Sequence, residues 1–366
     1  MKLIIAGGGT AGHINPGLAI ANEIKARKPD SEIIFIGTKK GLETNLVPRE
    51  GYKLELIKVM GFKRKISFEN VRAIAELTRS LKQVKRIIKE FKPDIVIGTG
   101  GYVCGPVLYV ASLMKIPTLI HEQNVFPGLT NRILSRFVDI VAVNFEETKK
   151  YLKHAKNIVH TGNPIKKEVL NNIKHDESAL TGRKNSRPLV IIFGGSRGAE
   201  NINKAIVELI LNYGNQCTFD ILFATGTAHY EEITKKLGDK ISESIQIVPY
   251  IYNMGKAMTS ADLAVCRAGA ITISELTVIG VPSILIPSPY VTANHQEYNA
   301  RTLEREGACV VILEKDLNGK ILYEQIRDLL KNKAQLNKMR ASARKMGIIN
   351  AGEKIWGLIE ELLAKV

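Results

Sequence analysis

The first candidate for chemistry is a histidine that ends a glycine-rich loop near the start of the chain. Residues 7–13 read Gly-Gly-Gly-Thr-Ala-Gly-His and follow a short apolar run. Glycines let backbone amides approach an anion closely, and the start of a following helix favours negative charge through its dipole. His13 therefore has two interpretations: a polar side chain that packs at the helix start, or a general base beside a phosphate-bearing ligand. Spacing alone leaves both open.

A second glycine loop lies in the other half of the chain. Residues 194–199 read Gly-Gly-Ser-Arg-Gly-Ala, and Ser196 adds a hydroxyl donor. Glycine loops after strands are common, so each alone is a weak signal, but one in each half favours two anion-binding turns. The first loop departs from the dinucleotide fingerprint, and no acidic residue closes the next predicted strand. We therefore do not expect a nicotinamide cofactor.

A third candidate is the helix start within residues 262–276, DLAVCRAGAITISEL. The pattern predicts a strand, a turn that carries Arg267, and a helix that contains Thr272 and Glu275. Helix-start amides beside a guanidinium suit a diphosphate. The Glu275 carboxylate can accept two hydrogen bonds from a ribose diol, or it can be an early acidic residue that favours the helix dipole.

Polar side chains also follow other predicted strands. The run 121–124 reads His-Glu-Gln-Asn, His295 and Gln296 precede a predicted helix, and Tyr102 lies among small residues. Imidazole and amide groups both donate and accept hydrogen bonds, as sugar hydroxyls require. The chain has no Asp-x-Asp pair and no helix-spaced His/Glu set, so we do not expect a metal site.

These loops need a scaffold that gathers strand ends. Short apolar runs alternate with helical patterns, which predicts buried parallel strands in an α/β protein. Because both halves repeat the order strand, glycine turn and helix, we predict two doubly wound domains with ligands at the carboxyl ends of their strands. The expected limits are 1–163 and 164–345, with a C-terminal helix over 346–366 that could pack on the first domain. The runs are 3–6, 32–37, 94–99, 116–120, 139–143, 188–193, 219–224, 245–249, 262–266 and 282–287.

Composition narrows the class of partner. The 366 residues are 45% hydrophobic and 24% charged, as in a globular protein, and carry a net charge of +16 that calls for an acidic partner. The four cysteines are scattered, which favours a reducing compartment. We expect no signal peptide, and no apolar run approaches the roughly 20 residues of a spanning helix. Any membrane contact is expected at the surface.

A basic segment could provide that contact. Residues 51–92 hold twelve Lys and Arg against four Asp and Glu. Their pattern predicts a helix with an apolar stripe flanked by cations, each worth about 1 kcal/mol near an anionic leaflet. The stripe could instead face the protein core. The stripe comprises Ile66, Val71, Ile74, Leu77, Leu81, Val84 and Ile87, and the cations are Arg72, Arg79, Lys82, Lys85, Arg86 and Lys89.

Seven motifs in order resemble the MurG family of peptidoglycan N-acetylglucosaminyltransferases, which convert lipid I to lipid II. They are GGGTAGHINPGLAIA, GTGGYVCGP, HEQN, GNPI, GGSRGA, CRAGAITISEL and NHQEYNA. The resemblance implies a GT-B fold with two Rossmann-like domains facing a cleft. It also implies that the C-terminal domain holds UDP-N-acetylglucosamine and that the N-terminal domain meets the lipid acceptor at the cytoplasmic face of the bacterial plasma membrane. No cofactor is implied.

The resemblance also implies roles for individual residues. Ser196 and the helix start at Ala270, Ile271 and Thr272 would contact the diphosphate, Glu275 the ribose, the backbone at Ile251 the uracil, and Gln296 the sugar. Thr10, Ala11 and Gly12 with Asn124 would close on donor or acceptor. Two positions depart from the family pattern: Ala11 replaces a frequent glycine, and Lys166 replaces a frequent arginine, so a bidentate phosphate contact becomes a point charge.

The implied reaction is an inverting displacement in which the C4 hydroxyl of the muramyl sugar attacks the anomeric carbon of N-acetylglucosamine. Ser196 and Arg267 would stabilise the departing diphosphate, and His13 would take the hydroxyl proton, with Glu122 in reserve. Two other classes remain: a UDP-N-acetylglucosamine 2-epimerase of the same fold, which needs no lipid, and a nucleic-acid-binding protein, favoured only by charge. We expect the lipid acceptor and an anionic lipid surface as partners, and no nucleic acid.

Overall fold

The computed structural model describes residues 1–59, 68–165, 169–171, 187–195 and 198–365, and for residues 68–74 only the backbone. The chain forms two compact units. Unit 1 comprises residues 1–165 and 350–366, and unit 2 comprises residues 166–349. Each is described by itself below.

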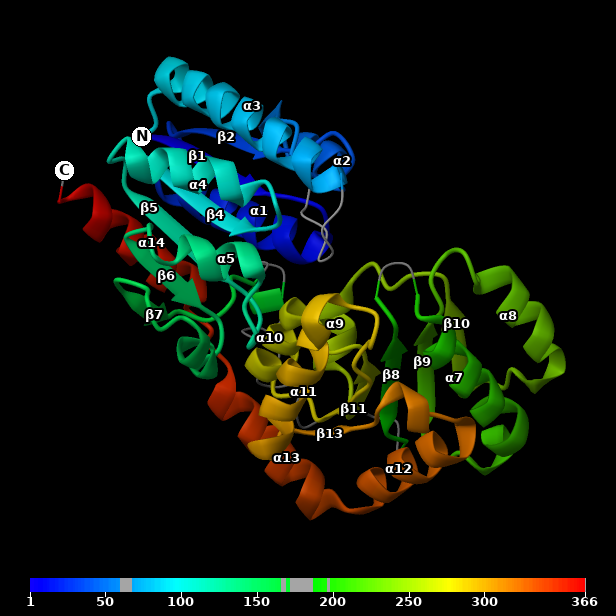
Figure 1. The fold of residues 1–366 in the computed structure, drawn as a ribbon. Coiled ribbons are helices and arrows are strands. Elements are labelled where there is room, and N and C mark those ends of the chain that lie inside the picture. Colours follow the sequence, from blue (N-terminus) through cyan, green and yellow to red (C-terminus); the bar gives the residue numbers. More distant parts are fainter. Residues whose placement is uncertain (60–67, 166–168, 172–186, 196–197, 366) are drawn as a thin grey trace. The chain divides into compact units, whose positions relative to one another are not determined.

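Unit 1 is built on a parallel sheet in which the described residues form seven strands (Figure 1). Their order, β3-β2-β1-β4-β5-β6-β7, reverses direction at β1, as in doubly wound folds. The strands are β1 (Lys2–Gly7), β2 (Glu32–Gly37), β3 (Lys53–Leu56), β4 (Ile95–Gly100), β5 (Thr118–Glu122), β6 (Ile140–Val143) and β7 (Ile158–His160).

Helices cover both faces of this sheet. Successive strand side chains point to opposite faces, so Ile4 and Ala6 of β1 join a core cluster with α3 and α4, whereas Leu3 and Ile5 join a cluster with α1 and α14. The C-terminal helix thus packs in unit 1, where Trp356 is buried beside α1. The helices are α1 (Ala11–Arg27), α2 (Glu43–Arg49), α3 (Phe68–Phe91), α4 (Cys104–Leu113), α5 (Leu129–Leu134), η1 (Glu146–Tyr151) and α14 (Ala351–Leu363).

Unit 2 repeats the design with six strands among its described residues, in the order β10-β9-β8-β11-β12-β13, all parallel. The strands are β8 (Leu189–Phe193), β9 (Asp220–Ala224), β10 (Ile245–Val248), β11 (Leu263–Cys266), β12 (Ser283–Leu285) and β13 (Cys309–Val311). The α-helices are α7 (Glu200–Tyr213), α8 (Tyr230–Leu237), α9 (Met254–Thr259), α10 (Ala270–Ile279), α11 (His295–Arg305), α12 (Gly319–Lys331) and α13 (Lys333–Met346). Short η turns are η3 (Gly214–Gln216), η4 (Gly238–Lys240), η5 (Thr292–Asn294) and η6 (Glu314–Asp316).

The prediction of two doubly wound Rossmann-like domains is confirmed. In the described part of the chain, no helix has the length and apolar character needed to cross a membrane. The C-terminal part of the apolar stripe, on α3, faces the protein: Val84 and Ile87 are buried in the core of unit 1, and Leu81 packs against it. The stripe positions Ile66, Val71 and Ile74, like the cation Arg72, lie where the structure describes no side chain.

Candidate functional site

The candidate residues that the structure describes lie in loops that follow strands or in the helix starts next to them. In unit 1 these loops follow β1, β4 and β5, and in unit 2 they follow β8, β10, β11 and β12. Because the strands within each unit are parallel, their carboxyl ends meet at one edge of that unit's sheet. Each unit therefore gathers its own candidate residues at one edge.

The first glycine loop brings the backbone close to His13. Gly8 N donates to Gly100 O at 3.2 Å. A Cβ at Gly100 would lie 2.3 Å from His13 Nδ1, and its φ of +120° also favours glycine. Thr10 precedes α1 in an extended conformation without a side-chain capping bond, and Thr10 and Gly12 are exposed while Ala11 is half-buried. These residues present backbone and a hydroxyl to solvent beside the imidazole.

A chain of hydrogen bonds runs from His13 into the core. His13 Nδ1 lies 3.3 Å from Gln123 Oε1, and Gln123 Nε2 lies 3.1 Å from His121 Nδ1. His121 Nε2 lies 2.9 Å from the carbonyl oxygen of Gly162. His121 and Gln123 are buried, whereas His13 is half-buried. Burial lowers the pKa of His121 to about 4, so this imidazole is neutral at pH 7.

The lowered pKa predicts a pH-dependent stability. Between pH 6.5 and 4 the unfolded chain binds a proton at His121 that the folded chain does not, so stability falls as the pH falls through this window. The loss reaches up to about 3 kcal/mol at pH 4. His121→Phe should remove this component, because phenylalanine does not bind a proton. The Gly162 carbonyl oxygen keeps a donor in this variant, since Thr161 Oγ1 donates to it at 3.0 Å. Urea unfolding at pH 7 and pH 4 of both proteins measures the difference, and equal pH dependence would contradict the prediction.

A buried carboxylate that sequence reasoning missed organises the first loop. Glu43, from the start of α2, is fully buried. Its Oε2 accepts from Gly9 N at 2.9 Å, and its Oε1 accepts from the Thr38 backbone N and Oγ1, each at 2.8 Å. One amide of the predicted anion-binding turn is therefore already used by an anion of the protein itself. A Cβ at Gly8 would lie 2.6 Å from Glu43 Oε1, so this contact also needs glycine.

Removal of this carboxylate should destabilise unit 1. Glu43→Ala deletes three hydrogen bonds and leaves the amides of Gly9 and Thr38 without their acceptor, so we expect the free energy of unfolding to fall by about 2–4 kcal/mol. Glu90→Ala is the control, because Glu90 forms an exposed pair with Arg86 and should change stability by less than about 0.5 kcal/mol. Denaturant unfolding measures both. Equal, small effects would show that Glu43 does not hold the loop.

Glu122 is also occupied by the protein. Its Oε1 accepts from Asn124 N at 2.9 Å and from Asn124 Nδ2 at 3.4 Å. Its Oε2 accepts from Gly128 N at 3.1 Å and from Asn131 Nδ2 at 2.8 Å. This buried carboxylate ties together the loop after β5 and thereby places Asn124. Tyr102, in the loop after β4, is 62% exposed.

Gly198, at the end of the second glycine loop, lies close to the backbone of the loop after β9. Gly198 has a φ of +77°, and a Cβ there would lie 2.1 Å from the carbonyl oxygen of Thr225. Asn203 Nδ2 donates to the same oxygen at 2.9 Å, which fixes the start of α7 against the loop after β9. Ser196 and Lys166, both predicted to contact phosphate, lie outside the described residues.

The start of α10 provides amides that have no acceptor within the helix. Gly269 precedes the helix in an extended conformation and offers no side chain, so the amides of Ala270, Ile271 and Thr272 belong to the first turn, where the helix supplies no acceptor. Ile271, Thr272 and Glu275 are half-buried. The helix ends at Gly280, whose φ of +84° forms a left-handed cap. This arrangement favours an anion at the start of α10.

Arg267 is engaged within unit 2. Its Nη2 is paired with Glu314 Oε2, and its Nη1 donates to the Ile286 carbonyl oxygen at 3.2 Å. Asn201 Nδ2 donates to Glu314 Oε1 at 2.6 Å. Both charged side chains are largely buried. The guanidinium thus joins the turn after β11 to the end of β12, a structural use that the sequence did not predict.

The remaining predicted residues of unit 2 also lie at this edge. Gln296 Oε1 accepts from Ser288 N at 2.9 Å, and in the described part of the chain its Nε2 has no hydrogen-bond partner. His295 Nδ1 lies 2.9 Å from the Thr292 carbonyl oxygen, so it is the protonated nitrogen of that contact. Ile251 is buried between two exposed tyrosines, Tyr250 and Tyr252, whose ring centroids are 5.3 Å apart.

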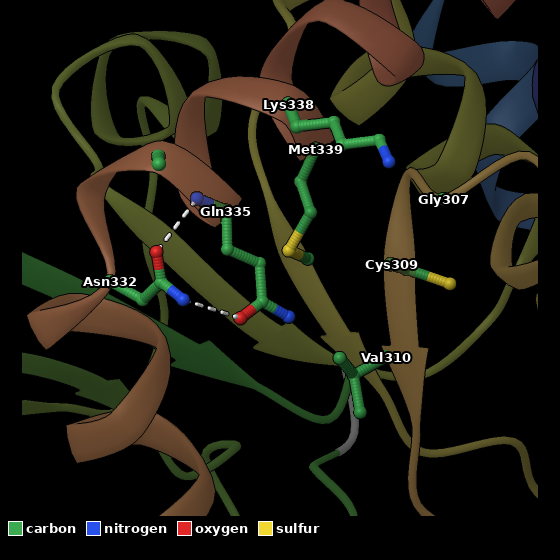
Figure 2. A pocket seen from close by; sticks show the side chains of 8 residues that line it. Gly307, Cys309, Val310, Asn332, Gln335, Lys338 and Met339 are labelled. Carbon is green, nitrogen blue, oxygen red and sulfur yellow. Dashed lines mark hydrogen bonds between the residues drawn. The ribbon is translucent and has the colours of Figure 1, made fainter.

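Two cavities lie at the opposite edges of the sheets. A cavity of 550 Å³ in unit 2 opens beside Cys309 and Val310, at the start of β13 (Figure 2). A polar group that lines it caps the start of α13: Asn332 Oδ1 accepts from Gln335 N at 3.0 Å. A cavity of 630 Å³ in unit 1 includes Glu32 and Lys53, at the starts of β2 and β3. Ligands of doubly wound sheets bind at the carboxyl ends of strands, so neither cavity marks the site.

A metal centre receives no support from the described residues. They contain no group of three or more His, Cys, Asp or Glu side chains that could hold an ion. The four cysteines are free and buried. Burial raises the pKa of the Cys104 thiol to about 12, so it stays protonated.

Comparison with known proteins gives matches along both units. Residues 3–143 match the model of the glycosyltransferase family 28 N-terminal domain, and residues 189–354 match that of the family 28 C-terminal domain. A protein of Acetivibrio thermocellus named UDP-N-acetylglucosamine–N-acetylmuramyl-(pentapeptide) pyrophosphoryl-undecaprenol N-acetylglucosamine transferase is 58% identical, over 99% of this chain and 98% of that protein. A protein of the same name from Ruminiclostridium cellulolyticum is 54% identical, over 99% and 100%. The crystal structure of Acinetobacter baumannii MurG matches with a TM-score of 0.80 and 29% identity, over 98% and 99%.

Proposed function

The chain belongs to glycosyltransferase family 28, and from this membership and the strand-edge residues of its two units we propose how it performs its reaction. It is a UDP-N-acetylglucosamine-dependent N-acetylglucosaminyltransferase of GT-B fold that acts on the pyrophosphoryl-undecaprenol muramyl-pentapeptide acceptor, lipid I. The observation that carries this conclusion is the identity of 58% over nearly the whole chain with a transferase so named. The roles of individual residues below are our proposals.

Unit 2 is proposed to hold the nucleotide sugar. The first-turn amides of α10 at Ala270, Ile271 and Thr272 would bind the diphosphate, and the helix dipole would stabilise the charge of departing UDP. Ser196 would donate a hydroxyl to the same group. Glu275 would accept from the ribose hydroxyls, the backbone at Ile251 would bind the uracil, and the Gln296 and His295 side chains would bind sugar hydroxyls. Lys166 would add a point charge.

Two of the predicted roles change in this proposal. Arg267 is assigned to positioning, because its guanidinium is paired with Glu314 and bound to a backbone carbonyl rather than directed at a ligand. Glu122 is likewise a positioning residue, because four N–H donors already saturate its carboxylate. The electrostatic stabilisation of the leaving group then depends on the α10 amides, each worth roughly 3–4 kcal/mol when well placed.

Unit 1 is proposed to supply the base and contacts to the acceptor. His13 takes the proton of the muramyl C4 hydroxyl as that oxygen attacks the anomeric carbon and the bond to UDP breaks, with inversion of configuration. The proposed contacts to the substrates from the same strand edge are made by Thr10, Ala11, Gly12, Tyr102 and Asn124. Within this division residues 1–163 meet the acceptor and residues 164–345 hold the donor.

Assay without an acceptor separates this reaction from the epimerase alternative. UDP-N-acetylglucosamine incubated with the enzyme alone should persist, because no hydroxyl acceptor is present and the proposed base has no role at C2 of the sugar. The products are resolved by nuclear magnetic resonance. Accumulation of the manno epimer would assign the site to a 2-epimerase. Inhibition of the lipid-acceptor assay by added RNA would in turn indicate a nucleic-acid partner.

We also propose that α3 contacts an anionic lipid surface at the cytoplasmic face of the plasma membrane. The stripe residues Leu81, Val84 and Ile87 pack in the core, so we propose an electrostatic contact. The side chains of Arg79, Lys82, Lys85, Arg86 and Lys89 are exposed, although Arg79 pairs with the buried Glu76 and Arg86 with Glu90. Such a surface attracts the protein through its headgroups rather than by insertion.

This proposal predicts a salt-dependent binding to vesicles. Combined Lys82→Gln, Lys85→Gln and Lys89→Gln should weaken binding to anionic vesicles by about 10²-fold, at about 1 kcal/mol for each cation. The matched control is Lys235→Gln, Lys236→Gln and Lys240→Gln, three exposed lysines of unit 2, which should bind as the wild type does. Vesicle sedimentation at two salt concentrations measures binding. Equal binding to neutral vesicles would refute the electrostatic contact.

A further inference from the structure

The protonation of His121 can be assigned from its partners. A backbone carbonyl only accepts, so the nitrogen 2.9 Å from Gly162 O, Nε2, carries the hydrogen. Burial lowers the pKa of this imidazole to about 4, so its other nitrogen, Nδ1, has a lone pair at neutral pH. That lone pair faces Gln123 Nε2 at 3.1 Å. His121 is therefore an acceptor toward Gln123.

The amide of Gln123 has one possible orientation. Its Nε2 lies 2.9 Å from the carbonyl oxygen of Thr99 and 2.8 Å from that of His121, in addition to the His121 lone pair. A flipped amide would place its oxygen against these three acceptors, with the side chain only 1% exposed and unable to recruit water. Oε1 therefore points to His13, and an amide oxygen only accepts.

We propose that Gln123 is a positioning residue that holds His13 as the Nδ1–H tautomer, so that Nε2 is the atom that takes the acceptor's proton. His13 Nδ1 must donate to Gln123 Oε1, which leaves the lone pair on Nε2. In the part of the chain that the structure describes, this nitrogen has no hydrogen-bond partner. The inference rests on the proposed role of His13 as the base.

The step balances with this assignment. The O–H bond of the muramyl C4 hydroxyl breaks as the proton moves to Nε2 of His13. The oxygen forms a bond to the anomeric carbon, and the bond from that carbon to UDP breaks with its electron pair leaving on the diphosphate. His13 becomes an imidazolium with both nitrogens protonated, and Gln123 Oε1 still accepts from Nδ1. The imidazolium loses the Nε2 proton to solvent before the next cycle.

The group that orients His13 is neutral, and the nearby carboxylates bind other partners. Gly100 packs on the ring, and the Cys104 thiol behind it lies 3.1 Å from the Gly100 amide. Glu43 binds Gly9 in the adjacent loop, and Glu122 is saturated within the loop after β5. The hydrogen-bond partner of Nδ1 is an amide, so orientation is achieved without a carboxylate, and the ring is directed by geometry rather than by charge.

The tautomer can be observed in the wild-type protein. In long-range proton–nitrogen correlation spectra of the ¹⁵N-histidine-labelled full chain at pH 8, His13, assigned by its loss in His13→Ala, should show a protonated Nδ1 and an unprotonated Nε2. His121 should show the opposite tautomer, with Nε2 protonated. A His13 signal of the Nε2–H tautomer would overturn the proposal whatever the enzyme activity is.

A pair of glutamine variants tests the positioning role. Gln123→Met should admit the Nε2–H tautomer of His13 and lower kcat by about 10²-fold, with less than a threefold change in KM for UDP-N-acetylglucosamine, because a misdirected imidazole loses base catalysis. Gln83→Met is the control: Gln83 also donates to a backbone carbonyl in unit 1, Leu56 O at 2.9 Å, and should preserve tautomer and kcat.

The outcomes distinguish failure of the positioning role of Gln123 from failure of the proposed role of His13 as the base. A Gln123→Met enzyme whose His13 keeps the Nδ1–H tautomer contradicts the positioning role, even if kcat falls through a structural change. Full activity of His13→Ala would instead remove the base assignment, and the wild-type spectrum would still report the tautomer. If Gln123→Met fails to fold, the wild-type spectrum alone decides the assignment.

Discussion

His13→Ala should lower kcat by about 10²- to 10⁴-fold at saturating donor and acceptor, which is the range expected for loss of a general base. The expectation follows from position: His13 lies in the first turn of α1, against Gly100, at the strand edge that also carries Tyr102 and Asn124. The Nδ1 side is turned inward to Gln123, so the ring presents its other nitrogen. The assay is a steady-state transfer measurement with both substrates saturating.

The control for this variant is His154→Ala, because His154 is an exposed histidine of the same unit outside the strand-edge loops. It should retain wild-type kcat. A fall of less than about tenfold in His13→Ala would show that this imidazole has a structural role only. In that case His13→Ala would change the stability of the folded protein more than it changes kcat.

Glu275→Gln should reduce kcat/KM for UDP-N-acetylglucosamine by about 10²-fold. Two hydrogen bonds from ribose hydroxyls to a carboxylate become bonds to a neutral amide, and bonds to charged groups contribute about 1.5–3 kcal/mol each. Glu275 lies one turn inside α10, so the side chain can reach a ribose whose phosphates sit at the helix start. Glu306→Gln, at an exposed site of unit 2, should be unchanged.

A substrate analogue makes this test specific. A UDP sugar without the 2′ and 3′ hydroxyls should lose about as much kcat/KM with the wild type as the normal donor loses with Glu275→Gln. With the variant, the analogue should lose little more, because the missing groups are each other's partners. Additive losses would mean that Glu275 acts on the helix rather than on the ribose.

The sequence predicted the central strands and one edge strand, β10, and missed the three other edge strands. Each of the ten predicted runs overlaps a strand, because a strand covered on both faces reads as a continuous apolar run. Lys53–Leu56, Ile158–His160 and Cys309–Val311 escaped prediction, and they are β3, β7 and β13, at sheet edges. They are short and only partly buried, so their sequences carry little hydrophobic signal.

The candidate site was predictable where the chemistry lies in a single loop. Glycine turns, the start of α10 and the polar run 121–124 are contiguous signals, and the structure places them at strand edges. Pairings between distant residues gave no such signal: Glu43 joins Gly9 across 34 positions, and Arg267 joins Glu314 across 47. Each inserts a carboxylate where the sequence suggested an open anion site. Such pairs arise from tertiary packing, so no local pattern could have shown them.

The most direct test of the central claim follows the sugar itself. Radiolabelled UDP-N-acetylglucosamine is offered to the full chain with and without a lipid-pyrophosphoryl muramyl-pentapeptide acceptor, and the lipid product is isolated and its new linkage determined. Label should enter the lipid only when the acceptor is present, at the C4 oxygen of the muramyl sugar and with inverted configuration. Label that never reaches the lipid, or that is converted to another nucleotide sugar at the same rate in both reactions, would contradict the account.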